Sequence, residues 1–202
     1  MFERRAREER PGEATEAELF EAVARGSEAA MAAIYRRHAG LVYRFSLRVG
    51  QDPSLAEEVT QEVFLAFLRQ ADRFDPGRAL LSTWLCGIAR RLLWKELERR
   101  QRRSRWEATD DGGEAESLAD NPAEALSRKE ALAAVQQGID SLPLPLKEIV
   151  VLCELEEMSY EDAAQVLGIP VGTVRSRLHR AKARLGLLLR GEQVSLVREN
   201  RT

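Results

Sequence analysis

A run of cationic and hydrogen-bonding side chains lies near the carboxyl end of the chain. Between residues 170 and 190 there are six Lys or Arg residues and no acid, a net charge of +6. At about 100° per residue of helix, one face of this segment carries Arg175, Ser176, His179, Arg180 and Ala183. Arg can bridge two acceptors of guanine, Ser and His can reach single base edges, and neighbouring cations can contact phosphates. The pattern favours a helix that contacts the major groove of DNA.

The residues before this run complete a helix-turn-helix pattern. A short amphipathic helix is expected over Ser159–Leu167, a turn at Gly168-Ile169-Pro170, and a second helix over Val171–Leu189. Ser159 followed by Asp162 resembles a capping box at the first helix start. The second helix has an apolar stripe opposite its polar face: Val174, Leu178, Ala181 and Leu185. The alternative, a solvated cationic surface helix, leaves the helix-turn-helix pattern unexplained, and His179 has no partner at a spacing that suits catalysis or a metal.

A second set of functional side chains lies on the helix expected over Pro53–Ala71. Its apolar face is formed by Leu55, Val59, Val63, Ala66 and Phe67. The other face combines Glu58, Gln61 and Glu62 with the outward-leaning Leu65 and Leu68. An acidic face with exposed leucines favours docking of a basic partner helix, with a plain solvated face as the alternative. A catalytic role for the carboxylates is disfavoured, because no His, Ser, Lys or metal-ligand pattern accompanies them.

A third set begins after the Asp75-Pro76-Gly77 turn. The segment from Arg78 to Trp84 leads into a basic helix with eight cations against two acids between residues 88 and 105, a net charge of +6. Trp84 and Trp94 are interleaved with these cations. Such a helix could hold a nucleic-acid backbone and cradle extruded bases, whereas Trp84 taken alone would be assigned to the core.

The elements that position these three sets are all helical. The chain has 202 residues, 44% hydrophobic and only 6% aromatic, and it lacks turn-punctuated β-branched runs. We therefore predict an all-α protein of two small domains, residues 13–103 and 122–189. The further helices expected are Glu16–Ala24, Ser27–Val49, Leu80–Arg103, Ala123–Ile139 and Leu144–Glu157.

A flexible acidic linker is expected between the domains, at residues 104–121. Residues 106–124 contain seven acids and no Lys or Arg, with Gly and Pro among them, and too few apolar residues to offset the entropy of ordering. Residues 1–12 and 191–202 are expected to be polar tails. No secretory signal and no membrane insertion are expected, Cys86 and Cys153 are interpreted as reduced packing thiols, and no zinc site or cofactor is expected.

Several segments together resemble a known family, the extracytoplasmic-function (ECF) sigma factors of bacterial RNA polymerase, within the sigma-70 family. The resemblance covers nearly the whole chain. Its segments are Tyr35–His38, Leu41–Arg44, Ala56–Phe64, Phe74–Arg78, Thr83–Leu85, Leu142-Pro143, Ser159–Ala164 and Gly172–Ala181. Members often have Asn and Asp where this chain has Arg91 and Lys95.

The resemblance implies that residues 13–103 are sigma region two and residues 122–189 are region four. Contacts to the beta-prime clamp helices of core RNA polymerase would be made by Glu58, Gln61, Glu62, Phe64 and Leu65. Contacts to the minus-ten promoter element would be made by Phe74, Asp75, Arg78, Ser82, Thr83, Trp84, Arg90 and Arg91. Contacts to the minus-thirty-five element would be made by Thr173, Arg175, Ser176, Arg177, His179, Arg180 and Arg184.

The implied protein is a cytoplasmic, non-enzymatic initiation factor with no catalytic residues. It would bind core polymerase, including the beta flap, recognise two promoter elements of the DNA and promote their melting, and an anti-sigma factor is an expected partner. Two other classes remain open. A stand-alone helix-turn-helix regulator would explain only the second domain, and an enzyme that uses Glu57 and Glu58 would lack a nucleophile and a ligand set.

Overall fold

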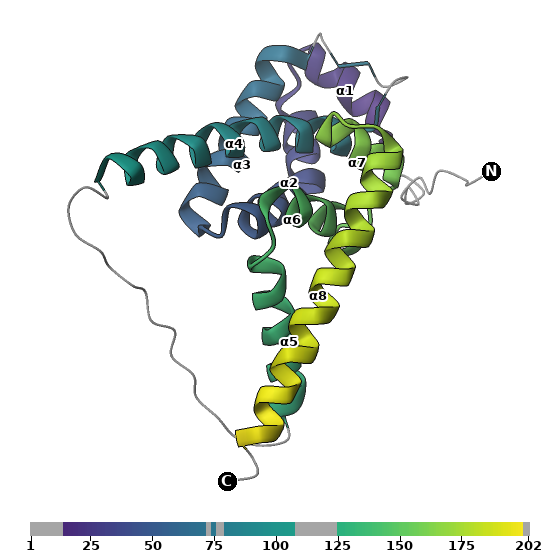
Figure 1. Ribbon diagram of the computed structural model, residues 1–202. Coiled ribbons are helices and arrows are strands. Elements are labelled where there is room, and N and C mark those ends of the chain that lie inside the picture. The colour runs from purple at the N-terminus through teal and green to yellow at the C-terminus, as the bar shows by residue number, and fades with distance from the viewer. Residues whose placement is uncertain (1–13, 72–73, 76–78, 108–124, 200–202) are drawn as a thin grey trace.

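The structure is a computed structural model, and it describes residues 14–71, 74–75, 79–107 and 125–199. Its regular elements within these ranges are all helical, which confirms the predicted all-α class (Figure 1). The first domain contains α1 (Glu16–Ala24), α2 (Glu28–Gly50), α3 (Pro53–Gln70) and α4 (Leu81–Glu107). The second contains α5 (Ala125–Asp140), α6 (Leu144–Val150), the π-helical turn η2 (Val151–Leu155), α7 (Tyr160–Leu167) and α8 (Val171–Glu199).

Local sequence signals determine where the helices of the first domain begin. Thr15 forms a capping box with Glu18 at the start of α1, and the Ser27 hydroxyl accepts from the backbone N–H of Ala30 at the start of α2. Asp52 accepts from the N–H of Leu55, and Pro53 occupies the first helical position of α3, where its missing N–H is tolerated. These caps fix the register, and therefore which face of α3 is buried.

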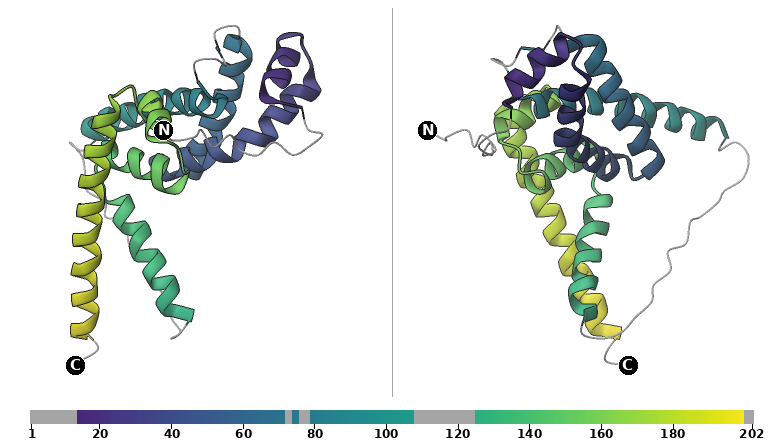
Figure 2. Two further views of the ribbon diagram at one scale, coloured as in Figure 1. Left: turned by 90° about the vertical axis from the view of Figure 1, so that its right-hand side faces the viewer. Right: turned by 180° about the vertical axis from the view of Figure 1, so that it is seen from behind.

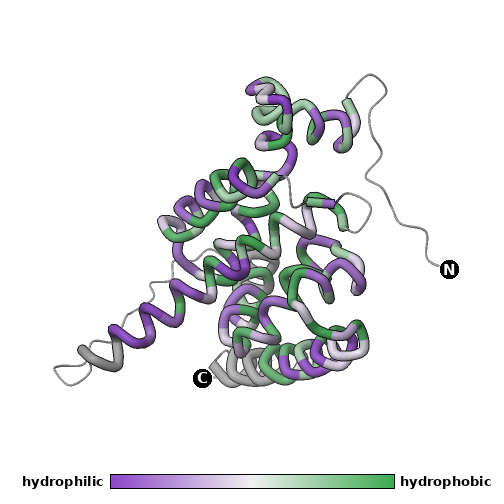
Figure 3. The backbone as a smooth tube through the Cα atoms, turned by 90° about the horizontal axis from the view of Figure 1, so that it is seen from above, coloured by the Kyte–Doolittle hydropathy of each residue, from purple (hydrophilic) through white to green (hydrophobic). Residues whose placement is uncertain are grey.

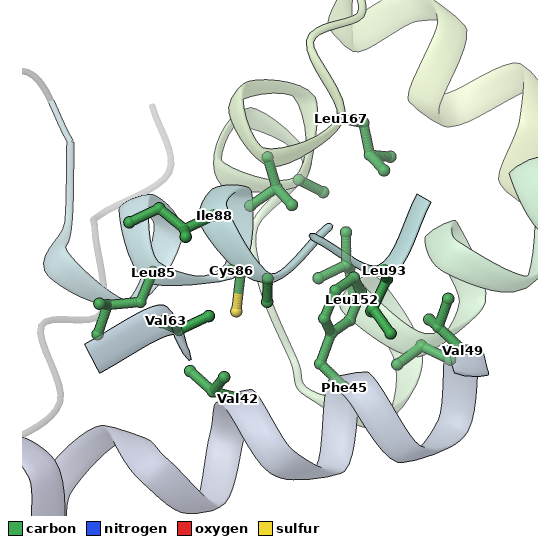
Figure 4. Close-up of a cluster of buried hydrophobic side chains, with 14 of the residues drawn as sticks. Val42, Phe45, Val49, Val63, Leu85, Cys86, Ile88, Leu93, Leu152 and Leu167 are labelled. Carbon is green, nitrogen blue, oxygen red and sulfur yellow. The ribbon is translucent and has the colours of Figure 1, made fainter. Parts of the chain in front are cut away.

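The core of the first domain is built around α2, which packs against α1, α3 and α4. Side chains one or two turns apart on α2, including Val42 and Phe45, are fully buried against Val63 of α3 and Leu85 of α4 (Figure 4). The polar outer part of α4 extends away from this core (Figure 3).

The second domain has the predicted helix-turn-helix. α7 ends at Leu167 and is capped by Gly168, whose φ of 64° places it in the left-handed region that favours glycine, and α8 begins three residues after this glycine. α8 packs against α5, α6 and α7. Two views show α5 and α8 as long helices that diverge from the compact part of the second domain (Figure 2).

The two domains also pack against each other, which the sequence did not predict. α4 contacts α7, and α2 contacts α6 and η2. Leu152 of η2 lies beside Phe45 of α2 and Leu93 of α4 (Figure 4), and all three are fully buried. The apolar cores of the two domains therefore join in one continuous cluster.

Two helices extend beyond their expected ends. α4 continues to Glu107, so the first four residues assigned to the linker are helical, and residues 108–121 lie outside the described part of the chain. α8 continues to Glu199, so most of the expected polar tail at residues 191–202 is helix. Charged side chains at helical spacing are compatible with a solvated helix, and composition alone does not separate such a helix from a tail. No helix of the described ranges combines the length and apolar character needed to cross a bilayer.

Candidate functional surfaces

The exposed face of α8 gathers the predicted DNA-contacting residues. Val174, Leu178 and Ala181 are buried against the rest of the second domain, as the apolar stripe predicted. This packing turns the opposite face to solvent, where five predicted residues are exposed: Arg175, Ser176, His179, Arg180 and Arg184. Thr173 and Arg177 are half-buried at its edge.

Short local hydrogen bonds order part of this face. The Ser176 hydroxyl donates to the backbone oxygen of Thr173 over 3.1 Å, and Nε of Arg180 lies 3.4 Å from the backbone oxygen of Ser176. The ammonium of Lys182, on the flank, lies 2.9 Å from a carboxylate oxygen of Glu154. The surface therefore presents guanidinium, imidazole and hydroxyl groups together, which are the groups that contact base edges and phosphates.

The outer face of α3 is acidic with an apolar margin. Glu58 and Gln61 are exposed, Leu65 is 51% exposed and Leu68 50%, as the helical spacing predicted. Glu62 is half-buried, and its Oε2 lies 3.1 Å from Nη2 of Arg69.

Phe64 does not belong to this exposed face. It is buried at 4% exposure, and its ring centroid lies 4.7 Å from that of Tyr35. The assignment of Phe64 as a docking residue is corrected to a supporting role, because it lies one position from Leu65 and one helical step of 100° turns it toward α2.

An apolar groove beside α3 adds residues that the sequence analysis missed. It has a volume of about 550 Å³ and lies between α1, α2 and α3. Met31, Tyr35 and Leu68 line it, and Tyr35 is 44% exposed. The one available signal was the amphipathic period of α2, which places Met31 and Tyr35 one turn apart on its surface.

An aromatic cluster holds the start of α4. Phe74 is buried at 8% exposure, with its ring centroid 5.1 Å from Phe20 and 5.5 Å from Trp84, and Trp84 lies 6.0 Å from Phe67. Phe74 is therefore corrected to a core residue, while Trp84 is half-buried. The residues between α3 and α4 have no helical periodicity from which the burial of Phe74 and the partial exposure of Trp84 could be predicted.

The other predicted minus-ten residues are in different environments. Asp75 and Arg91 are exposed and Ser82 is half-buried, whereas Arg78 lies outside the described residues. Thr83 is buried at 3% exposure, where its hydroxyl donates to Oδ1 of Asp162 over 3.2 Å. The predicted minus-ten residues therefore lie at or near the start of α4, but only some of them are accessible to a ligand from solvent.

Arg90 contacts a buried carboxylate of the second domain. Nε of Arg90 donates to Oε1 of Glu148 over 2.8 Å, and Nε1 of Trp94 donates to the same oxygen over 2.6 Å. The guanidinium carbon of Arg90 lies 5.5 Å from the centre of the Trp94 ring, within cation–π range. Glu148 is 1% exposed, and burial raises its pKa although Trp94, Arg90 and Arg177 act in the opposite direction.

The two thiols lack the features of reactive cysteines. Cys86 and Cys153 are both free. Burial raises the pKa of Cys86 to about 12 and that of Cys153 to about 11, which disfavours the thiolate. No group of three or more His, Cys, Asp or Glu side chains among the described residues is arranged to hold a metal ion.

Comparison with known proteins identifies the family. The model of sigma-70 region 2 matches residues 34–103, and that of sigma-70 region 4 matches residues 132–185. The chain is 35% identical to the ECF RNA polymerase sigma factor SigE of Mycolicibacterium smegmatis over 177 residues, which are 86% of this chain and 67% of that protein. It is also 35% identical to the RNA polymerase sigma-H factor of Pseudomonas aeruginosa, over 82% of this chain and 89% of that one. The chain belongs to the ECF sigma factors.

Two solved structures resemble this sigma factor along most of its length. One is the sigma factor RpoE in complex with the anti-sigma factor NepR from Bartonella quintana, with a TM-score of 0.62 and 27% identity over 78% of this chain and 95% of that chain. The other is CnrH in complex with the cytosolic domain of CnrY, with a TM-score of 0.62 and 28% identity over 86% and 96% of the two chains. The protein is thus a transcription initiation factor, as the sigma-factor names of its relatives indicate.

Proposed function

We propose that this sigma factor binds core RNA polymerase through α3 and promoter DNA through α4 and α8. One observation carries the proposal: a region-2 match and a region-4 match occur in order in one chain, each on a domain with an exposed surface suited to its partner. The proposed domain boundaries remain 13–103 and 122–189, apart from the helical residues 104–107.

The proposed polymerase contact is the acidic face of α3. Glu58, Gln61 and Leu65 present carboxylate, amide and apolar groups side by side, and Glu62 lies at the margin. This combination suits a helix with basic and apolar residues, and we assign the beta-prime clamp helices as that partner. The beta flap is the proposed partner of the second domain, where Leu132, Val135 and Leu187 are exposed apolar residues.

The proposed promoter contacts lie on two helices. On α8, Arg175, Ser176, His179 and Arg180 would face base edges of the minus-thirty-five element, with Thr173, Arg177 and Arg184 nearer phosphates. On the first domain, the segment from Asp75 to Trp84 together with Arg90 and Arg91 would engage the minus-ten element, with the cations on the backbone and the half-buried Trp84 near an unstacked base.

The family relationship also supports a proposal for how this protein is regulated and where it acts. Because the similar sigma factor RpoE is seen in complex with the anti-sigma factor NepR, we propose an anti-sigma partner for this chain too. We also propose that it acts in the cytoplasm and performs no bond chemistry. A stand-alone helix-turn-helix regulator is less well supported, because it assigns no role to the region-2 domain.

Transcription in vitro with core polymerase tests the proposal directly. A library of genomic fragments from the source bacterium serves as template, with and without the protein. A double charge reversal, Glu58→Lys/Glu62→Lys, changes the α3 surface, and Glu21→Lys/Glu98→Lys gives the same change in net charge on α1 and the outer part of α4. Circular dichroism checks that all variants fold.

The expected result is that defined start sites arise only with the protein, persist in the control variant and disappear in the α3 variant. Specific binding of fragments by the protein alone, with no new start site in the presence of polymerase, would support the stand-alone regulator instead. Start sites that survive the α3 reversal would move the polymerase contact elsewhere.

A further inference from the structure

Some cations of α4 are not neutralised by the fold. Arg91, Lys95 and Arg103 are exposed, and no carboxylate in the described part of the chain lies within ion-pair distance of them. The other cations of α4 between residues 88 and 103 are paired with acids: Arg90 with Glu148, Arg99 with Glu96, Arg100 with Asp52 and Arg102 with Glu98. The helix surface therefore keeps positive charge that is available to a further anion.

Two of the unpaired cations lie on a stripe of α4 that begins at Trp84. At 100° per residue of helix, four side chains fall within about 40° of one another: Trp84, Arg91, Lys95 and Arg102. Arg103 lies about 100° away from Arg102 and is outside this stripe. At a rise of 1.5 Å per residue, the three cations span about 17 Å, and the distance along the helix from Trp84 to Arg102 is about 27 Å. We call Arg91, Lys95 and Arg102 the cation stripe.

The cation stripe is open to solvent. Arg91 and Lys95 are exposed, and the side chain of Arg102 is 83% exposed. Glu98 lies beside the stripe, with its Oε2 3.8 Å from Nη2 of Arg102, and an exposed pair at this distance contributes little. The polar outer part of α4 extends away from the core (Figure 3), so an extended ligand can approach the stripe along its length.

The surroundings of the cation stripe favour a nucleic acid over a protein as its ligand. Between residues 81 and 103, no large apolar side chain of α4 is exposed, whereas protein interfaces have an apolar core. No aromatic residue stands on the stripe between Arg91 and Arg102, and single-stranded nucleic acids need aromatic side chains for stacking. Each strand of a duplex holds one phosphate per 3.4 Å of axis, so a straight stripe of about 17 Å runs along about five phosphates.

We propose that the cation stripe binds the phosphate backbone of the duplex that adjoins the minus-ten element. The inference rests on the proposed position of Trp84 near an unstacked base, because the stripe begins at Trp84 and a strand that leaves this base continues into duplex. It adds Lys95 and Arg102 to the DNA surface and assigns Arg91 to phosphate and not to a base edge. Members of the family often have Asn and Asp where this chain has Arg91 and Lys95, so two of the three cations are particular to this chain.

Fluorescence anisotropy of the free full-length protein tests the proposal. The probes are a labelled random-sequence duplex of about 20 base pairs, longer than the roughly 8 base pairs that 27 Å covers, and a random single strand of equal length. Arg91→Ala/Lys95→Ala removes two stripe cations. Arg36→Ala/Arg103→Ala removes the same charge from exposed sites on α2 and on α4 outside the stripe. Circular dichroism verifies folding, and the contribution of α8 is common to all proteins.

The salt dependence of duplex binding gives the decisive quantity. Each lost phosphate contact lowers the slope of log affinity against log salt by about 0.9, so the stripe variant should have a slope smaller by about 1.8. Its loss of affinity should then be about twelvefold greater at 50 mM than at 200 mM salt. The control variant should keep the wild-type slope. Equal slopes for the stripe variant and the control would overturn the inference, as would a loss on the single strand as large as that on the duplex.

Two duplexes of defined composition separate backbone binding from base recognition. Arg91 on phosphate predicts an equal loss of affinity for A·T and G·C duplexes, whereas a loss confined to the G·C duplex would place Arg91 on guanine and overturn the assignment. None of these measurements uses polymerase. Unchanged slopes together with defined start sites in the transcription assay would overturn the stripe alone, and the absence of start sites together with a reduced slope would overturn the initiation role alone.

Discussion

The buried Glu148 makes the domain contact measurable as an energetic coupling. We consider Arg90→Ala, Glu148→Gln and the double variant. Glu148 is 1% exposed and its Oε1 accepts two hydrogen bonds, while its Oε2 is buried without a hydrogen-bond partner in the described part of the chain. The carboxylate therefore depends on Arg90 and Trp94 to offset its desolvation.

The expected magnitudes follow from that arrangement. Removing one partner of a buried ion pair costs about 3–5 kcal/mol, and because the Arg90 side chain is 25% exposed we expect Arg90→Ala to lower the unfolding free energy by about 3 kcal/mol. Glu148→Gln keeps an oxygen that can accept from both donors and removes a buried charge, so its cost should be below about 1 kcal/mol. In the double variant no charge is left unpaired, and its total cost should be about 1 kcal/mol.

Urea unfolding followed by circular dichroism at neutral pH measures all four proteins. The key quantity is the coupling energy of the double-mutant cycle, expected to be about 2–3 kcal/mol and opposite in sign to the sum of the single effects. The slopes of the transitions must agree for the comparison to be valid. An Arg90→Ala variant within about 0.5 kcal/mol of wild type, or strictly additive effects, would refute a persistent contact between Arg90 and Glu148 in solution.

Three further outcomes are expected. Burial raises the pKa of Glu148, whose charged neighbours are Arg90 of α4 and Arg177 of α8, so the folded protein retains the carboxyl proton above the unfolded pKa of 4.5. The stability of the wild type relative to Glu148→Gln should therefore fall as the pH rises from 4.5 through the raised pKa. Melting temperatures of the two proteins that stay parallel from pH 5 to 8 would contradict this expectation. Ser159→Ala removes the N-cap of α7, where the hydroxyl accepts from the N–H of Asp162 over 3.0 Å, and should cost about 1 kcal/mol in urea unfolding, with an unchanged midpoint as the contrary result. Arg180→Ala should weaken promoter binding by about 1–3 kcal/mol if it contacts a base, as measured by electrophoretic mobility shift of the holoenzyme, whereas a uniform loss on all sequences with a smaller salt slope would place it on phosphate.

The amphipathic faces were predictable from sequence because each depends on neighbours within the same helix. Val174 and Leu178 are buried while Arg175 and His179 are exposed, as a period of 3.6 residues requires. The start of α3 was equally predictable, since Asp52 and Pro53 act through local backbone hydrogen bonding.

Features that depend on distant residues were not predictable. Phe64 was assigned to a docking face but packs on Tyr35, 29 positions earlier in the chain, and no spacing within α3 indicates this contact. Thr83 and Arg90 were expected to face DNA, and their partners Asp162 and Glu148 come from another domain. A pattern of cations identifies a basic helix but does not distinguish a nucleic-acid partner from a carboxylate of the same chain.

The contact between the two domains combines buried carboxylates with an apolar cluster. Each buried carboxylate loses hydration that its hydrogen bonds regain only in part, so ionic pairs of this kind contribute little net stability but make a misaligned contact costly. The favourable free energy then comes mainly from the apolar side chains around Leu152, and the carboxylates restrict closure to one register.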